Sequence, residues 1–207
     1  MNANNVPLND EEQRNARFQG PFKWFIVRIG DKYKLALNKV GLFSRRDLVR
    51  MSDLKFYAEV SLALDSGFST VKGKQLDDLY KKYNGTFPIE VDLEDALSYP
   101  IETFLATPEL HKPTLLRTHV FQSLVLAILV RRDPERLATL VPAAHQALLA
   151  EINAKAVPME VLADALQTPD DFPALQDFID ACSKKTNVEE SKRIRFIYFY
   201  EALGIRA

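Results

Sequence analysis

Start and stop signals for α-helices recur along the whole of this 207-residue chain, whereas signals for β-strands are nearly absent. Asn9 precedes three acids, which is typical of a capped helix N-terminus, and Pro21 can occupy the first position of the next helix. No alternating run rich in Val, Ile or Thr is bounded by hairpin residues, and seven glycines are too few for an all-β protein. The sequence therefore predicts an all-α fold, an irregular bundle of about eight to ten helices with no significant sheet.

The expected helices are delimited by these signals and by apolar residues at steps of three and four. Phe22, Phe25, Ile26 and Ile29 form one such apolar face after Pro21. We expect Pro100 to divide the helical segment around it. The most apolar segment, 113–132, is the expected central helix. The later helices are expected at about 44–65, 74–83, 92–106, 113–132, 135–154, 159–167, 172–184 and 188–203.

The length of the chain suits one large domain or two small ones that share a core. We divide it into residues 1–20 with the first helix, an N-terminal helical subdomain over 21–110 and a C-terminal helical subdomain over 111–207, packed as one unit. No apolar run reaches the roughly 18–20 residues of a membrane span, because Gln122 and Ser123 interrupt the best candidate. The N-terminus has no signal-peptide pattern, so a cytoplasmic protein without a membrane partner is expected.

Patterns for catalysis and metal binding are missing from the sequence. His111, His119 and His145 lack the spacing of a metal site, and no glycine-rich phosphate loop is present. Cys182 is the single cysteine, which excludes an internal disulfide, and its helical context favours a buried side chain. Paired acids fall at helix starts, where the helix dipole favours them. We therefore expect no catalytic residue, no metal and no cofactor, and a chain that is not an enzyme by itself.

The formal net charge of −1 hides a polarity along the chain. Between Arg14 and Lys55, eleven Lys or Arg residues stand against three acids, a net charge of +8, so the remainder carries −9. Such a segment can face phosphates, an acidic part of the same protein, or solvent. Basic and aromatic residues also alternate in 18–28 and 193–200. In a helix this pattern indicates either stacking on single-stranded nucleic acid or aromatic rings inside with arginine stems outside. These interpretations stay open.

The segment from Asn2 to Ala16 contains Leu8-Asn9, then Glu12, then Arg14-Asn15-Ala16. It resembles a signature of the GmrSD-type restriction endonuclease N-terminal domain family, R-x-N-x-x-x-x-x-L-N-x-x-E-x-R-N-A, although Gln13 replaces the family's usual Leu. Residues 43–54 are similar to the family's R-M-x-D region, and 74–83 to its L-D-x-x-Y helix. The resemblance covers about residues 2–85. The family's upstream D-G-Q-Q-R motif, tied to nucleotide handling and nuclease action, is absent.

The resemblance implies that this chain corresponds to the helical C-terminal portion of such a domain. In the family, that portion follows a ParB/sulfiredoxin-like α/β part, and the whole serves phage defence by acting on modified DNA under nucleotide control. The implied protein partner is the ParB-like nuclease half or a full-length relative. DNA is a second candidate partner, and self-association through the uncovered face is a third. A free-standing helical interaction module or inhibitor is the alternative function.

The resemblance also implies a candidate site for nucleotide or DNA contact. Its residues would stand at the junction of the two parts, where Arg14 and Asn15 could reach a phosphate. Alternatively, Glu12 and Arg14 only tie the junction together. The candidate residues, which include arginines of the basic segment, are Asn9, Glu12, Arg14, Asn15, Arg17, Arg45 and Arg46.

Overall fold

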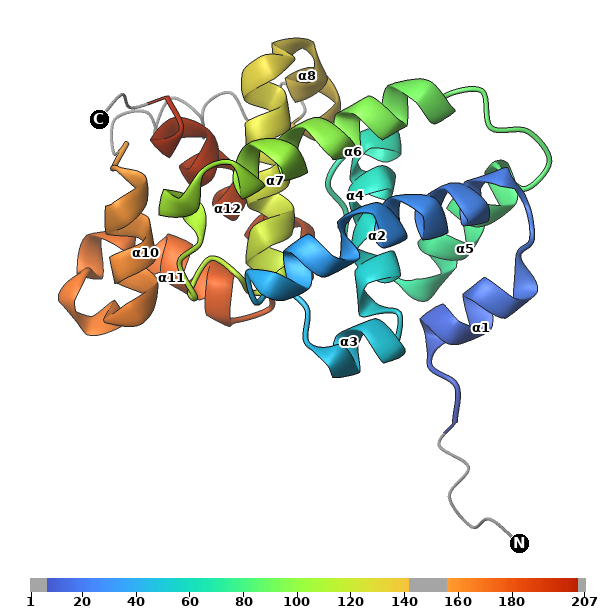
Figure 1. The fold of residues 1–207 in the computed structure, drawn as a ribbon. Helices are drawn as coiled ribbons and strands as arrows, with labels where there is room; N and C mark the ends of the chain where they lie inside the picture. The colour runs from blue at the N-terminus through green and yellow to red at the C-terminus, as the bar shows by residue number, and fades with distance from the viewer. Residues whose placement is uncertain (1–6, 142–155, 205–207) are drawn as a thin grey trace, which may run out of the picture.

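The computed structural model describes residues 7–141 and 156–204, whose course is shown in Figure 1. Over these ranges the chain forms eleven α-helices and short 3₁₀ turns, and they contain no strand, so the predicted all-α fold is confirmed. The helices are α1 (Asp10–Arg17), α2 (Pro21–Lys39), α3 (Arg45–Val49), α4 (Ser52–Ser66), α5 (Gly73–Lys82), α6 (Glu90–Leu105), α7 (Thr118–Arg132), α8 (Leu137–Leu140), α10 (Met159–Gln167), α11 (Gln176–Ser183) and α12 (Glu189–Ala202).

Helix α7 is the centre of the molecule, as its apolar sequence predicts. Every residue from Val120 to Val130 is buried, so other elements surround this helix on all sides. It packs against α12, α6 and α4. The ring of Phe121, for example, lies 5.4 Å from that of Phe56 in α4 and 4.6 Å from that of Phe104 in α6. These contacts cross the proposed boundary at residue 110, and the division into two subdomains stays a prediction.

Local signals explain where several helices begin. The Asn9 side chain accepts hydrogen bonds from the first turn of α1, and the Glu12 carboxylate accepts the backbone N–H of Asn9 at 2.7 Å, which completes a capping box. Ser44 and Asp47 form the same arrangement at the start of α3. Pro21 occupies the first position of α2, as expected.

Two predictions about helix continuity were wrong. The helix expected over 44–65 is broken into α3 and α4, because Met51 adopts a left-handed conformation with φ of 56° that an α-helix cannot contain. Conversely, α6 continues through Pro100. The burial of Leu97, Ile101 and Phe104 on both sides of the proline holds this helix together, although one backbone hydrogen bond is lost.

The remaining predicted helices differ from the observed ones mainly at their ends. The central helix begins at Thr118 rather than at residue 113, and the helix expected from 172 begins at Gln176 after a 3₁₀ turn. Of the helix expected over 135–154, the structure describes only the start, α8, and the rest lies outside the described residues. Within the described ranges, no helix combines the length and apolar character that a membrane crossing needs.

Charged side chains tie α2 to α6. Arg28 bonds to both Glu90 and Glu94, at 2.8 and 2.9 Å, and the Tyr33 hydroxyl donates to Glu102 at 2.6 Å. Because later residues of α2 meet later residues of α6, the two helices run parallel. The acids of α6 thus neutralise part of the basic segment.

Candidate interaction site around helix α1

Helix α1 lies against α4 and α5 and buries charged rather than apolar side chains. Glu11 and Arg14 are each 3% exposed and form an ion pair with one another. The Nε of Arg14 also donates to Asp77 Oδ1 at 2.9 Å, and the Tyr80 hydroxyl donates to Glu11 at 3.2 Å. The one apolar residue of α1, Ala16, is exposed. A buried polar network therefore holds this helix in place.

The pKa values of the network reflect burial and pairing together. Burial raises the pKa of the Glu11 carboxyl, and the Arg14 guanidinium and the Tyr80 hydroxyl oppose that rise. Burial alone would lower the pKa of Arg14, but the pairs with Glu11 and Asp77 outweigh it, so this pKa is raised. Burial would raise the pKa of Asp77, but hydrogen bonds from Arg17 and Arg14 lower it. The pKa of each charged group in the network is therefore set by its ion-pair partners as well as by burial.

A second attachment joins the start of α1 to the break between α3 and α4. The Asn9 side-chain amide donates to the carbonyl oxygen of Arg50 at 2.9 Å. The Arg50 guanidinium in turn lies 3.3 Å from the Glu12 carboxylate. Asn9 and Glu12 therefore cap α1 and also bind it to the neighbouring corner.

The structure places the predicted site residues of the first helix in contacts with this chain itself. Asn9, Glu12 and Arg14 make the contacts just described, and Arg17 pairs with Asp77. Asn15 is half-buried, and its carbonyl oxygen accepts a hydrogen bond from Gln19. These contacts favour the interpretation in which the signature residues tie a junction together, while a contact with nucleotide or DNA stays a prediction.

Arg45 and Arg46, the other two predicted site residues, lie apart from this network. Both are exposed on α3, and neither side chain has a hydrogen bond or ion pair within the described residues. The network itself includes residues that the sequence reasoning missed. Only the three-residue spacing of Glu11 and Arg14 could have indicated it, because Asp77 and Tyr80 are more than sixty positions away.

Three small cavities flank α1 and share Asp10 in their lining. Their volumes are about 230, 80 and 340 Å³. Within the described residues, no group of three or more His, Cys, Asp or Glu could hold a metal ion. The lining is mostly charged and includes Asp10, Arg14, Arg17, Arg50, Lys55, Glu59 and Asp77.

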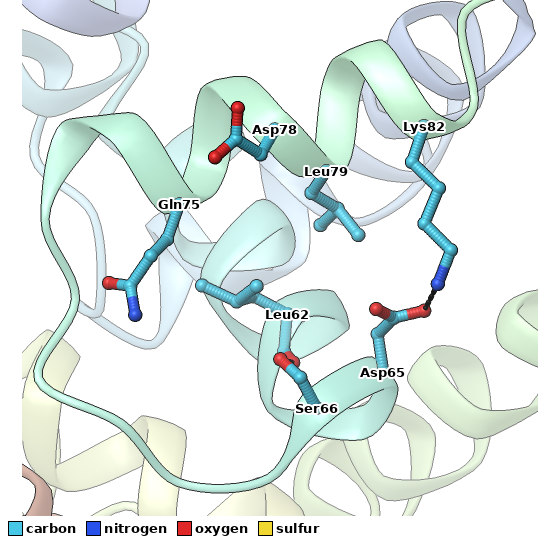
Figure 2. A pocket seen from close by; sticks show the side chains of 7 residues that line it. All are labelled: Leu62, Asp65, Ser66, Gln75, Asp78, Leu79 and Lys82. Atoms are coloured by element: carbon cyan, nitrogen blue, oxygen red, sulfur yellow. Dashed lines mark hydrogen bonds and ion pairs between the residues drawn. The ribbon is translucent and has the colours of Figure 1, made fainter.

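A further cavity of about 240 Å³ lies between α4 and α5. Figure 2 shows Asp65 of α4 and Lys82 of α5 pointing toward one another, and their charged atoms are 2.6 Å apart. Asp65 also accepts a hydrogen bond from the Tyr83 hydroxyl at 2.8 Å, and the Gln75 side chain accepts the backbone N–H of Lys72. Asp65 thus holds α4 against Lys82 and Tyr83 at the end of α5, whereas Gln75 caps the start of α5.

The single cysteine and two of the histidines are bound within the fold. Cys182 is buried, as expected, and burial raises the pKa of its thiol to about 12, so the reactive thiolate is scarce. The ring nitrogens of His119 and His111 lie 2.9 Å from the carbonyl oxygens of Cys182 and Phe104. His145 lies outside the described residues.

Most of the basic segment is neutralised within the molecule. Seven of its eleven cations contact an acid or an aromatic ring of this chain: Arg14, Arg17, Lys23, Arg28, Lys32, Arg50 and Lys55. Over residues 7–141 and 156–204, the side chains of the other four have no hydrogen bond or ion pair: Lys34, Lys39, Arg45 and Arg46. The segment therefore mainly faces acids of its own chain, and only its α2–α3 end offers unpaired charge.

The interleaved aromatic residues point mainly inward. Phe22, Phe25 and Phe196 are buried, whereas Trp24 is 53% exposed with the Lys23 ammonium over its ring. This arrangement favours core packing over stacking on nucleic acid. Comparisons with known proteins add no relative: no family model, no curated protein and no solved structure matches this chain.

Proposed function

We propose that this chain is a non-catalytic helical domain of a modification-dependent restriction system, and that α1 is the surface on which a nucleotide-handling nuclease domain docks. One observation carries the proposal. Asn9, Glu12 and Arg14, the polar residues of the segment that resembles the family signature, all bind inward to α3–α5. A helix fixed in this way presents a preorganised outer face to a partner, which lowers the cost of binding.

The outer face of α1 is suited to a protein partner. Leu8, immediately before the helix, is 58% exposed, and Gln13 and Ala16 are exposed as well. Exposed apolar side chains with a polar rim are typical of docking surfaces. The same face offers a route to self-association when the partner is missing.

The state of the carboxylates supports a non-catalytic role. Asp77 beside α1 and Asp65 between α4 and α5 are both engaged by arginine or lysine. A general acid or base needs a carboxyl group that can reach a substrate and exchange a proton near neutral pH. Carboxylates held in ion pairs serve structure instead.

The test is affinity capture from the native host followed by mass identification of the partner. We expect a protein that carries D-G-Q-Q-R, and we expect Leu8→Asp together with Ala16→Arg to reduce its recovery. Leu35→Asp is the matched control, because Leu35 is 83% exposed on α2, away from α1. Equal recovery with both variants, or cleavage of modified DNA by this chain alone with Mg²⁺, would contradict the proposal.

A free-standing interaction module is the second candidate, favoured by a different surface. Trp24 and Leu35 on α2 and Val91 on α6 are exposed, while the charges between these two helices are paired with one another. A partner bound there would be lost on Leu35→Asp and retained on Leu8→Asp. The same capture experiment therefore separates the two candidates.

A further inference from the structure

Arg45 and Arg46 belong to a larger basic surface that only the tertiary structure reveals. Gly41, in the turn between α2 and α3, packs near Leu116, so that a side-chain carbon at Gly41 would lie 3.9 Å from Leu116 Cδ1. This contact brings the loop before α7 beside the end of α2, as Figure 1 shows. The loop carries two exposed cations, Lys112 and Arg117.

Five exposed cations therefore lie on the end of α2, on α3 and on the loop that approaches the α2–α3 turn, and we name them the basic corner: Lys39, Arg45, Arg46, Lys112 and Arg117. In the part of the chain that the structure describes, none of the five has a hydrogen bond or ion pair from its side chain. The acid within α3, Asp47, is occupied by the helix cap, where it accepts the backbone N–H of Ser44 at 2.9 Å. The corner is thus the opposite of the α2–α6 contact, where cations and acids are matched.

The backbone beneath the corner is firmly held. The Asn38 side chain donates to the carbonyl oxygen of Phe43 at 2.6 Å, and the ring of Phe43 is buried. On the other side, Leu115 is buried just before Arg117. Cations on a rigid backbone lose less conformational entropy when they bind a ligand. Helix α7 begins directly after Arg117 without a side-chain cap, and its free N–H groups add positive potential.

We propose that the basic corner binds the phosphate backbone of duplex DNA. Arginine guanidinium groups match phosphate oxygens in a bidentate geometry, and three of the five cations are arginines. Leu35 and Val49 are the large exposed apolar residues nearest in sequence to the corner, too few for the apolar centre of a protein interface. The choice of DNA among polyanions rests on the proposed function. The phosphate contacts supply affinity and orientation rather than sequence recognition.

The test is binding of a short labelled DNA duplex at low salt, followed by fluorescence anisotropy over a salt series. Two variants remove charge from the two halves of the corner: Arg45→Ala with Arg46→Ala, and Lys112→Ala with Arg117→Ala. The matched control, Lys32→Ala with Arg132→Ala, removes the same charge from exposed cations that already have acidic partners. For each corner variant we expect affinity to fall by about tenfold and the salt slope of log K to fall by about 2. The control should bind nearly as the parent protein does.

Several outcomes would overturn the proposal. The proposal would be overturned if the corner variants bound DNA as tightly as the parent protein. It would also be overturned if the control variant lost as much DNA affinity as the corner variants, because binding would then follow net charge alone. If the parent protein does not bind DNA but binds an acidic peptide through the corner, this surface is a protein-docking site instead. Capture of the D-G-Q-Q-R partner depends on the α1 face and should survive both corner variants, so the two proposals can fail separately. Circular dichroism confirms that each variant is folded.

Discussion

Among the residues that the structure describes, two arginines are buried, one at the edge of the molecule and one at its centre, and they are stabilised in different ways. Arg14 in α1 is 3% exposed and lies between two carboxylates, those of Glu11 and Asp77. Its positive charge is compensated by negative charge, and its pKa is raised. The network attaches a helix that buries no apolar side chain of its own.

Arg195 in α12 is 0% exposed and is bonded to neutral oxygens. Its guanidinium donates to Ser123 Oγ of α7 at 3.2 Å and to the carbonyl oxygens of Ala181 and Thr186 at 2.5 and 3.0 Å. Burial lowers its pKa to about 10, since no carboxylate in the described part of the chain forms an ion pair with it. Ala181 lies in the last turn of α11, whose carbonyl groups carry partial negative charge.

The comparison separates two uses of a buried cation. Arg195 joins α7, α11 and α12 within a mainly apolar core, so its substitution should destabilise the whole fold. Arg14 holds one peripheral helix, so its substitution should mainly destabilise α1. Burial alone does not distinguish the two arginines, whereas the elements that each connects do.

The largest effect is expected from Arg195→Met. Three oxygen atoms in the centre would lose their donor, and each buried acceptor left unsatisfied costs about 1–3 kcal/mol. Urea unfolding followed by circular dichroism should show this loss as one cooperative transition at lower urea. Arg132→Met is the control, because that arginine pairs with Asp95 on the surface and such pairs contribute about 1 kcal/mol or less. Equal losses in both variants would refute the central role of Arg195.

A smaller and local effect is expected from Arg14→Met. Hydrogen bonds to charged groups contribute about 1.5–3 kcal/mol each, but release of α1 limits the loss, because the rest of the fold does not depend on this helix. Amide hydrogen exchange should accelerate in residues 10–17 and stay unchanged in α7. Exchange that accelerates equally in both helices would show that α1 is part of the cooperative core.

The sequence predicted local features of this molecule better than contacts between distant segments. The apolar run at 120–130 was sufficient to place α7, and the residues around Asn9 were sufficient to predict its capping box, because both are local patterns. The partners of Arg14 are not local, since Asp77 is 63 positions away. The left-handed Met51 that divides α3 from α4 also carries no glycine or asparagine signal.

The basic segment shows the same limit for the candidate site. Its excess of positive charge was visible in the sequence, but which cations are paired depends on α5 and α6, which follow the segment in the chain. Arg17 and Arg46 look alike in the sequence, yet one has an acidic partner and the other has none among the described residues. Lys112 and Arg117 could not be assigned to the same surface until Gly41 was seen beside Leu116.

The pH dependence of the Arg14→Met variant sharpens the comparison further. Burial raises the pKa of Glu11 in the folded protein, and Arg14 opposes that rise, so the variant should raise it more. A carboxyl group with a raised folded-state pKa stabilises the fold below its unfolded-state pKa, and this contribution is lost as pH rises through the folded-state value. The variant should therefore lose more stability at pH 7 than near pH 4. Adding Glu11→Gln should remove that difference, and a difference that persists would place its origin elsewhere.

The smallest effect is expected from Ser123→Ala, which removes one acceptor of Arg195 and leaves the two carbonyl oxygens in place. Ser123 is buried in α7, and alanine fits the same space without a cavity. A single hydrogen bond contributes about 0.5–1.5 kcal/mol, so urea unfolding should show a loss in this range, well below that of Arg195→Met. Such a result would show that the carbonyl groups at the end of α11 compensate most of the buried charge. A loss as large as that of Arg195→Met would instead make the serine hydroxyl the critical partner. Arg195 would then depend on the side chains of its partners, as Arg14 does.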